Sequence, residues 1–112
     1  MVVPLEDYQH VCDRESLPQR GKKTIYIEGI KLLLIACETG IYALEDRDPQ
    51  TGGSLAHAKV LDCVLTSPNT GARYSLQTGQ YLGGGQSPLQ SHWLPLWRVR
   101  VKGDKVYVSR SV

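Results

Sequence analysis

The lack of a helical repeat is the feature that most constrains what this chain can fold into. No stretch keeps apolar residues at helical spacing for three turns. Short segments rich in β-branched and aromatic residues instead alternate with turn signals, roughly one every ten residues. At 112 residues the chain has the length of one domain and can bury a sizeable core. We therefore expect a single all-β domain over residues 1–112, built as a β-sandwich or a small barrel.

Antiparallel hairpins are the expected unit of this fold. Polar and apolar residues alternate over residues 23–28, and the apolar segment 30–37 follows a turn around Glu28 and Gly29. Residues 97–109 show the same alternation on both sides of the sequence KGDK. Further strands are expected at residues 8–12, 40–46, 59–67 and 72–77, and the segments 47–59 and 82–95 lack strand character.

Charge and hydropathy argue against several classes of partner. Charged residues make up 21% of the chain and the net charge is only +2, so a nucleic-acid surface is not expected. The longest unbroken apolar run, residues 32–37, is far shorter than the roughly 18 residues that a bilayer span needs. The first ten residues show no basic segment followed by an apolar core. We expect a cytoplasmic protein that binds neither nucleic acid nor membrane.

The three cysteines, Cys12, Cys37 and Cys63, are odd in number and show no close pairing. This pattern fits a reducing compartment better than a disulfide framework. Free cysteines are usually buried, so we expect three buried thiols.

No motif of a known catalytic site is present. The chain has no Gly-x-Ser-x-Gly and no His-Glu-x-x-His, and the glycines at residues 83–85 are not followed by the lysine of a phosphate loop. Glu45, Asp46 and Asp48 lie close together in sequence, but Arg47 sits among them. We expect solvated loop charges there, and no catalytic activity of the chain alone.

Trp93 and Trp97 flank a proline and are followed by two arginines. Such a segment suits three roles: burial in the core, contact with a protein partner, or stacking on single-stranded nucleic acid. The weak overall charge disfavours the third role, and the sequence leaves the first two open.

The order strand, DPQTGGSL, strand and TSPNTGARYSLQTGQYL resembles the cluster-binding subdomain of Rieske-type ferredoxins, here about residues 45–82. In that family, two loops supply Cys-x-His and Cys-x-x-His to a two-iron cluster. The corresponding positions are Asp48, Gln50, Ser67 and Thr70, so the frame matches while all four ligands are replaced. The resemblance implies a Rieske-like ferredoxin fold, and the replaced ligands predict that this chain binds no metal.

The pairs Asp48-Pro49 and Ser67-Pro68 are similar to those of the cluster-less small subunit of cytoplasmic NAD(P)H-dependent nitrite reductase. This resemblance implies a non-catalytic subunit that docks on a large subunit holding siroheme, FAD and an iron-sulfur cluster, which reduces nitrite to ammonium in nitrate assimilation. TGGSL and NTGARY are closer to true Rieske ferredoxins. They keep open a protein-binding or electron-transfer component of another oxidoreductase, such as an oxygenase, with His57 and Cys63 as the unexpected ligands that electron transfer would require.

Asp48 and Ser67 each precede a proline and can accept hydrogen bonds from backbone amides two or three residues on. We expect neutral hydrogen-bonded side chains to bridge the two loops in place of a metal. The loops are then either a relic or a docking surface. The residues expected to serve docking are Asp48, Gln50, Thr51, Ser67, Asn69, Thr70 and Trp93.

Overall fold

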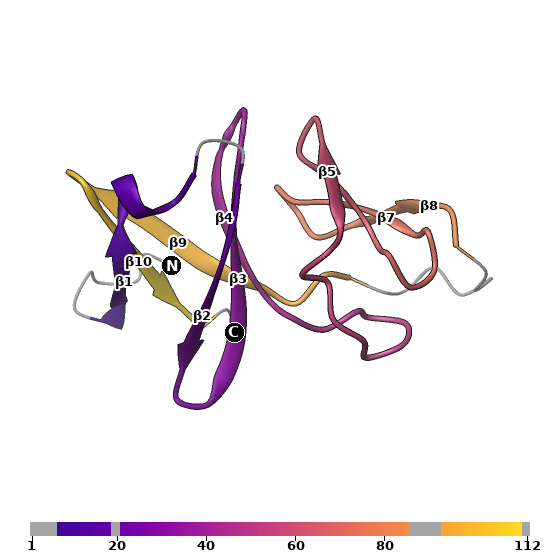
Figure 1. The fold of residues 1–112 in the computed structure, drawn as a ribbon, viewed down its shortest axis with the longest axis horizontal. Coiled ribbons are helices and arrows are strands. Elements are labelled where there is room, and N and C mark those ends of the chain that lie inside the picture. The colour runs from indigo at the N-terminus through magenta and orange to yellow at the C-terminus, as the bar shows by residue number, and fades with distance from the viewer. Residues whose placement is uncertain (1–6, 19–20, 86–92, 111–112) are drawn as a thin grey trace.

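The chain folds almost entirely into β-strands. A computed structural model describes residues 7–18, 21–85 and 93–110, and these ranges contain no α-helix and no helix that could span a membrane. The elements are β1 (Gln9–Asp13), the 3₁₀ turn η2 (Arg14–Ser16), β2 (Lys22–Ile27), β3 (Ile30–Cys37), β4 (Gly40–Glu45), β5 (Lys59–Leu61), β6 (Val64–Thr66), β7 (Arg73–Ser75), β8 (Tyr81–Gly83), β9 (Leu96–Lys102) and β10 (Lys105–Ser109) (Figure 1). The expected all-β class is confirmed.

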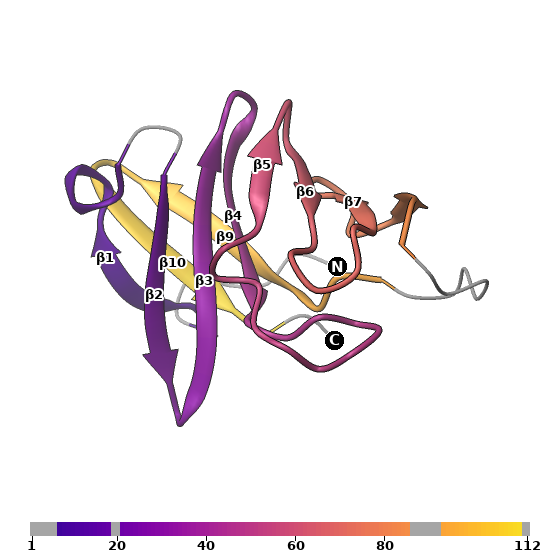
Figure 2. The same ribbon diagram turned by 45° about the vertical axis from the view of Figure 1, so that its right-hand side comes forward.

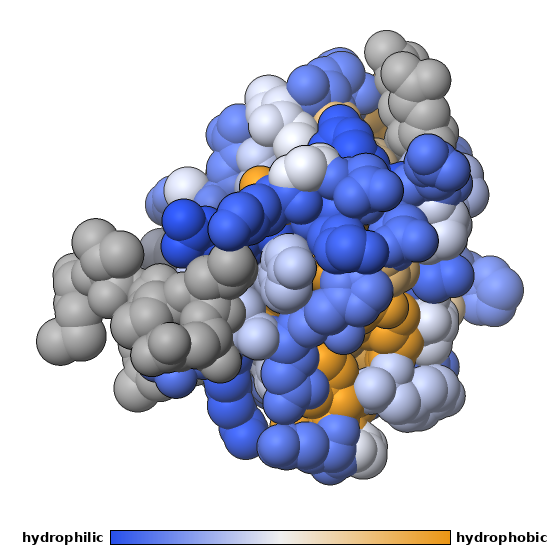
Figure 3. Space-filling model, turned by 90° about the vertical axis from the view of Figure 1, so that its left-hand side faces the viewer, coloured by the Kyte–Doolittle hydropathy of each residue, from blue (hydrophilic) through white to orange (hydrophobic). Residues whose placement is uncertain are grey.

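Six of the strands form a sheet that curls into a nearly closed barrel. Its order is β1-β10-β9-β4-β3-β2, and every neighbouring pair is antiparallel. The interior is filled by apolar side chains that alternate along these strands. Its buried residues are Cys12, Leu17, Ile25, Ile27, Leu32, Leu34, Ala43, Trp97, Val106 and Val108. Seen from the side where β1 lies, an apolar strip is visible between hydrophilic residues (Figure 3).

A second, four-stranded sheet covers the outer face of the barrel at β3 and β4 (Figure 2). A separate core fills the space between them, made of Leu33, Ile35, Leu44, Leu55, Ala58, Leu65, Ala72, Tyr74, Leu76 and Leu94. In β3, Leu32 and Leu34 point into the barrel, whereas Leu33 and Ile35 point into this second core. Burial on both faces explains why β3 is an unbroken apolar run without alternation.

The two main hairpins follow the sequence prediction. Glu28 and Gly29 form the turn between β2 and β3, with φ of 51° and 81°, and β9 and β10 pair across the expected KGDK turn. The single strand expected at residues 59–67 was wrong. Asp62 and Cys63 adopt φ of 53° and 58° and form a two-residue turn, so β5 and β6 are a hairpin.

Two further expectations need correction. Strand β8 lies partly within segment 82–95, which was expected to be a loop, and residues 86–92 of that segment are outside the described residues. Cys12 is free and buried as predicted, but Cys37 and Cys63 form a disulfide. Their turns meet in space across the two sheets, with the Cα atoms 5.5 Å apart, and a separation of 26 residues in sequence gives no hint of this.

Candidate functional site

Two loops of the second sheet meet side by side and form the candidate site. The first loop, residues 46–58, joins β4 to β5, and the second loop, residues 67–72, joins β6 to β7. Each loop is closed by its own backbone hydrogen bonds. Asp48 N–H donates to Gly53 O at 2.7 Å, and Ser67 N–H donates to Ala72 O at 2.8 Å. The side chains of Asp48 and Ser67 are therefore held where the ends of each loop come together.

The carboxylate of Asp48 is the hydrogen-bond acceptor at the centre of the site. Its side chain is buried, with 1% of the residue exposed. Oδ1 accepts from the amides of Gln50 at 2.7 Å and Thr51 at 3.3 Å, and Oδ2 accepts from Ser67 Oγ and from Asn69 Nδ2 at 3.2 Å. The predicted turn around Asp48 is confirmed, and the carboxylate also joins the first loop to the second.

Ser67 repeats this arrangement in the second loop. Its side chain is buried, and its Oγ accepts from the amides of Asn69 at 3.0 Å and Thr70 at 3.4 Å while it donates to Asp48. Asn69 completes the bridge, because its Nδ2 also donates to Ser54 O at 3.2 Å. The hydrogen-bonded bridge between loops that the sequence predicts is confirmed, but the expectation of neutral side chains was wrong, because the bridge centres on the carboxylate of Asp48.

The charge of Asp48 is stabilised by these donors. Burial raises the pKa of the carboxyl, but hydrogen bonds from Ser67, Gln50 N, Asn69 and Thr51 N together outweigh it and lower the pKa below its usual range. Asp48 is therefore ionised at neutral pH. A buried anion held by four donors is a rigid element, since loss of any donor leaves the charge poorly compensated.

Gly53 allows the two loops to approach closely. A Cβ atom at this position would lie 3.0 Å from Nδ2 of Asn69, which is tighter than ordinary van der Waals contact. The second glycine of the sequence TGGSL therefore leaves room for the amide that donates to Asp48.

The acidic residues beside Asp48 are not the solvated loop charges expected from the sequence. Asp46 forms an ion pair with Lys31 at 2.9 Å and accepts hydrogen bonds from Leu55 N at 2.6 Å and from Ser54 Oγ. Burial raises the pKa of Asp46, but the hydrogen bonds from Lys31, Leu55 and Ser54 lower it by more than burial raises it. The net shift of this pKa is therefore downward. Asp46 therefore anchors the first loop to β3, a contact too distant in sequence to predict.

Glu45 is also a structural partner. It accepts a hydrogen bond from Trp97 Nε1 at 2.9 Å and one from Arg47 at 3.3 Å. Trp97 is buried in the barrel core, whereas 55% of Trp93 is exposed. Of the two roles left open for this segment, Trp97 takes the core, and Trp93 is exposed and available for partner contact.

Behind the bridge lie two polar side chains that the sequence did not single out as a pair. Gln50 Nε2 and the Tyr74 hydroxyl are buried without a hydrogen-bond partner among the described residues. Burial and the nearby charge of Asp48 raise the pKa of Tyr74, while the neighbouring Gln50 amide opposes this shift. Tyr74 also packs edge-on against Tyr81, with ring centroids 5.8 Å apart. Because its pKa is raised, Tyr74 is neutral, and its ring forms one side of the site.

The residues expected to dock a partner differ in exposure. Thr51 and Asn69 are exposed at the loop surface, and Gln50 and Thr70 are half-buried. Asp48 and Ser67 are buried. The two residues that bridge the loops can therefore influence a partner only through the shape of the loops.

Comparisons with known proteins agree with the fold. The sequence matches the family described as the Rieske-like [2Fe-2S] domain over residues 7–109. No curated protein sequence matches the chain. Among solved structures, a protein described as the small subunit of an NADPH nitrite reductase shares 27% identity at a TM-score of 0.76, covering 90% of this chain and 96% of that one.

Two further structures share the fold alone. The ferredoxin of carbazole 1,9a-dioxygenase from Nocardioides aromaticivorans IC177 has a TM-score of 0.77 and 13% identity, covering 93% of this chain and 98% of that one. The terminal oxygenase of carbazole 1,9a-dioxygenase from Novosphingobium sp. KA1 has a TM-score of 0.80 and 18% identity, covering 94% of this chain but 30% of the oxygenase.

The two-iron cluster in the family's description does not fit the residues of the two loops. Such a cluster needs thiolates and imidazoles, and the corresponding positions hold Asp48, Gln50, Ser67 and Thr70. The side chains of Asp48 and Ser67 are hydrogen-bonded to each other. In the part of the chain that the structure describes, no three His, Cys, Asp or Glu side chains gather as metal ligands. Cys63 forms a disulfide with Cys37, so in this state it cannot serve as an alternative thiolate ligand.

Proposed function

The chain belongs to the Rieske-like [2Fe-2S] domain family, and from this premise we propose that it is a non-catalytic accessory subunit of a cytoplasmic NAD(P)H-dependent nitrite reductase. In this role it binds no cluster and acts by docking on the large subunit, which reduces nitrite to ammonium. The large subunit carries siroheme, FAD and an iron-sulfur cluster, as the resemblance implies.

The observation that carries this proposal is the hydrogen-bonded bridge between Asp48, Ser67 and Asn69. In a Rieske ferredoxin the metal centre holds the two loops together, because each loop supplies two ligands. Here a buried, fully hydrogen-bonded carboxylate joins the same two loops. A site that keeps its shape without the redox centre suits recognition of a partner better than electron transfer.

The proposed docking surface consists of the loop tips and of the exposed Trp93, which pairs with Gln80 at the other end of β7. Thr51 and Asn69 supply exposed polar groups, and Trp93 supplies an exposed aromatic ring of the kind that often dominates protein interfaces. Gln50 and Thr70 line the same loops, while Asp48 and Ser67 hold them in position. The solved relative described as a nitrite reductase small subunit supports this choice of partner.

A second candidate is a protein-binding component of another oxidoreductase, such as an oxygenase. It is favoured by the fold shared with ferredoxins, one of them solved in a complex of oxygenase and ferredoxin in carbazole 1,9a-dioxygenase. An electron-transfer version would require a cluster from residues other than those of the two loops.

The visible spectrum of the material that co-purifies with the tagged chain from its native host tests the proposal. Siroheme and flavin bands that travel with a much larger polypeptide are the expected result. A larger partner that lacks siroheme would favour the second candidate. Stoichiometric iron and acid-labile sulfide in the anaerobically purified chain alone would contradict the cluster-less role.

A further inference from the structure

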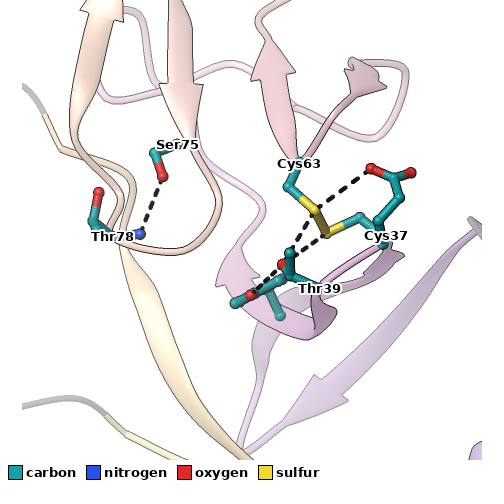
Figure 4. Close-up of a disulfide and its surroundings, with 7 residues drawn as sticks. Cys37, Thr39, Cys63, Ser75 and Thr78 are labelled. Atoms are coloured by element: carbon teal, nitrogen blue, oxygen red, sulfur yellow. Dashed lines mark hydrogen bonds between the residues drawn. A yellow bond between two sulfur atoms is a disulfide. The ribbon is translucent and has the colours of Figure 1, made fainter.

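The disulfide between Cys37 and Cys63 joins the barrel to the second sheet at the tips of two hairpins (Figure 4). Cys37 ends β3 and pairs with Gly40 across the β3–β4 turn. Cys63 is the second residue of the β5–β6 turn. The bond lies at the end of β6 away from the second loop, so it is separate from the bridge between the two loops.

Cys63 occupies a backbone conformation that disfavours a side chain. Its φ of 58° follows that of Asp62 at 53°, and both values lie in the left-handed region that glycine and asparagine adopt most readily. Tertiary contacts must hold such a residue in place. For Cys63 the covalent bond to Cys37 is the most direct of these contacts.

The two cysteine residues differ in exposure to solvent. Cys63 is buried, with 6% of the residue exposed, whereas Cys37 is half-buried. Cys37 also lines a cavity of about 940 Å³ at the end of the barrel, together with Arg14, Leu17 and Thr39. A small thiol can therefore reach Cys37 from the cavity.

The polar groups beside the disulfide favour one leaving group. Thr39 Oγ1 lies 3.3 Å from Cys63 Sγ and 3.9 Å from Cys37 Sγ, and the Tyr42 hydroxyl lies 2.7 Å from Thr39 Oγ1 (Figure 4). A hydroxyl at this position can donate to a thiolate that forms on Cys63, which makes Cys63 the better leaving group. Glu38 Oε2, 3.9 Å from Cys63 Sγ, opposes that charge from a longer distance.

We propose that Cys37 is a thiol-exchange site at which a low-molecular-weight thiol opens the Cys37–Cys63 disulfide. The thiolate attacks Cys37 Sγ, a mixed disulfide forms there, and the electron pair of the broken S–S bond leaves on Cys63. A second thiolate then attacks the sulfur of the bound thiol and releases Cys37 as a thiolate. In total, two thiols are oxidised to one disulfide, and the two cysteines gain two electrons and the two protons that the thiols give up.

Exchange at this site does not require the second sheet to leave the barrel. Lys22 Nζ donates to Ala58 O across the two sheets, and the ion pair between Lys31 and Asp46 anchors the first loop. Neither contact involves the disulfide. The inference does not depend on the proposed function, because it concerns the opposite end of β6.

Mass spectrometry of the full chain with reduced glutathione as the probe tests the proposal. Samples taken over time are alkylated at the native pH of the reaction, then quenched with acid and digested. We expect glutathione on Cys37 and the alkylating label on Cys63 while Cys12, which is buried and free, stays unlabelled. Glutathione first on Cys63, or exchange that occurs only together with labelling of Cys12, would overturn the proposal, since the latter reports global unfolding.

Three variants separate the roles of the neighbours. Thr39→Val should slow the opening about fivefold, because it removes a hydrogen bond to the leaving thiolate. Glu38→Gln should speed it, because it removes an opposing charge. Thr24→Val, on the exposed face of β2, is the matched control and should leave the rate unchanged. Equal rates in all three variants, with unchanged circular dichroism, would show that Thr39 does not stabilise the leaving group. A reduced chain that oxidised glutathione cannot close would overturn the site itself.

Discussion

Ser67 donates its hydroxyl hydrogen to Asp48, so the side chains at two positions that correspond to cluster ligands are bonded directly to each other. Each of the two side chains also accepts hydrogen bonds from backbone amides of its own loop. One buried pair therefore sets the shape of both loops and their separation. Any partner that recognises the loops depends on this pair without touching it.

Asp48→Asn should destabilise the protein by about 2 kcal/mol, because an amide cannot accept all four hydrogen bonds that the carboxylate accepts. Urea unfolding followed by circular dichroism measures the change. Asp104→Asn, at an exposed turn position, is the matched control and should stay within about 0.5 kcal/mol of the wild type. Equal stability of the two variants would contradict the central role of Asp48.

Acid should destabilise the protein through Asp46 and Asp48. The pKa of each carboxyl is lower in the folded chain than its ordinary value of 3.8. Their stabilising contribution is thus fully present above pH 3.8 and is lost as the pH falls through the lower folded-state pKa values. Urea midpoints measured from about pH 6 down to about pH 2 should fall in the acid range, and the decrease should be smaller in Asp48→Asn. A pH profile of that variant identical to the wild type would show that Asp48 does not titrate with folding.

The two tryptophans should behave differently. Trp97→Phe should cost about 1–2 kcal/mol of stability, since it removes the hydrogen bond to Glu45 and part of the core packing. Acrylamide should quench the fluorescence of this variant efficiently, because Trp93, its remaining tryptophan, is exposed. Trp93→Phe should show the protected emission of Trp97. Similar quenching of both variants would contradict the assigned burial.

Docking should depend on exposed groups of the loops and on Trp93. Trp93→Ala and Thr51→Arg should each reduce recovery of the large partner by about tenfold or more in a pull-down, with the free energy of unfolding little changed. Leu61→Ser is the matched control for Thr51→Arg, because Leu61 is 74% exposed and lies at the turn end of the β5–β6 hairpin, away from the second loop. Loss of the partner with Leu61→Ser but not with Thr51→Arg would show that the loops are not the interface.

Removal of the disulfide should lower stability by about 3 kcal/mol, because the bond closes a loop whose ends are 26 residues apart. The double substitution of Cys37 and Cys63 by serine removes it without leaving a free thiol at either position. Urea unfolding with and without a phosphine reductant measures the effect. Reductant should destabilise the wild type and leave the double variant unchanged, and a wild type insensitive to reductant would contradict the prediction.

Local sequence signals predicted the hairpins and the loop turns. The β2–β3 and β9–β10 hairpins follow from alternation and glycine turns, and the caps at Asp48 and Ser67 follow from short-range hydrogen-bonding geometry. In each case the residues that decide the structure lie within a few positions of one another. Patterns of this length are visible in a single sequence.

Contacts between segments that are distant in sequence could not be predicted from such local patterns. The pairing of Cys37 with Cys63 and that of Lys31 with Asp46 depend on how the second sheet lies against the barrel, which no local pattern encodes. The turn at Asp62 and Cys63 was missed because cysteine is an unusual residue at positive φ, and the pair lacks the glycine of the common two-residue turns.

Strand β3 is a wall common to two cores, since Leu32 and Leu34 belong to one and Leu33 and Ile35 to the other. Neither core can lose this strand without exposing the other to water. The barrel and the second sheet are therefore one cooperative unit, and heating or denaturant should unfold them in a single transition. A domain built in this way has no half-folded form in which the loops exist without the barrel that supports them.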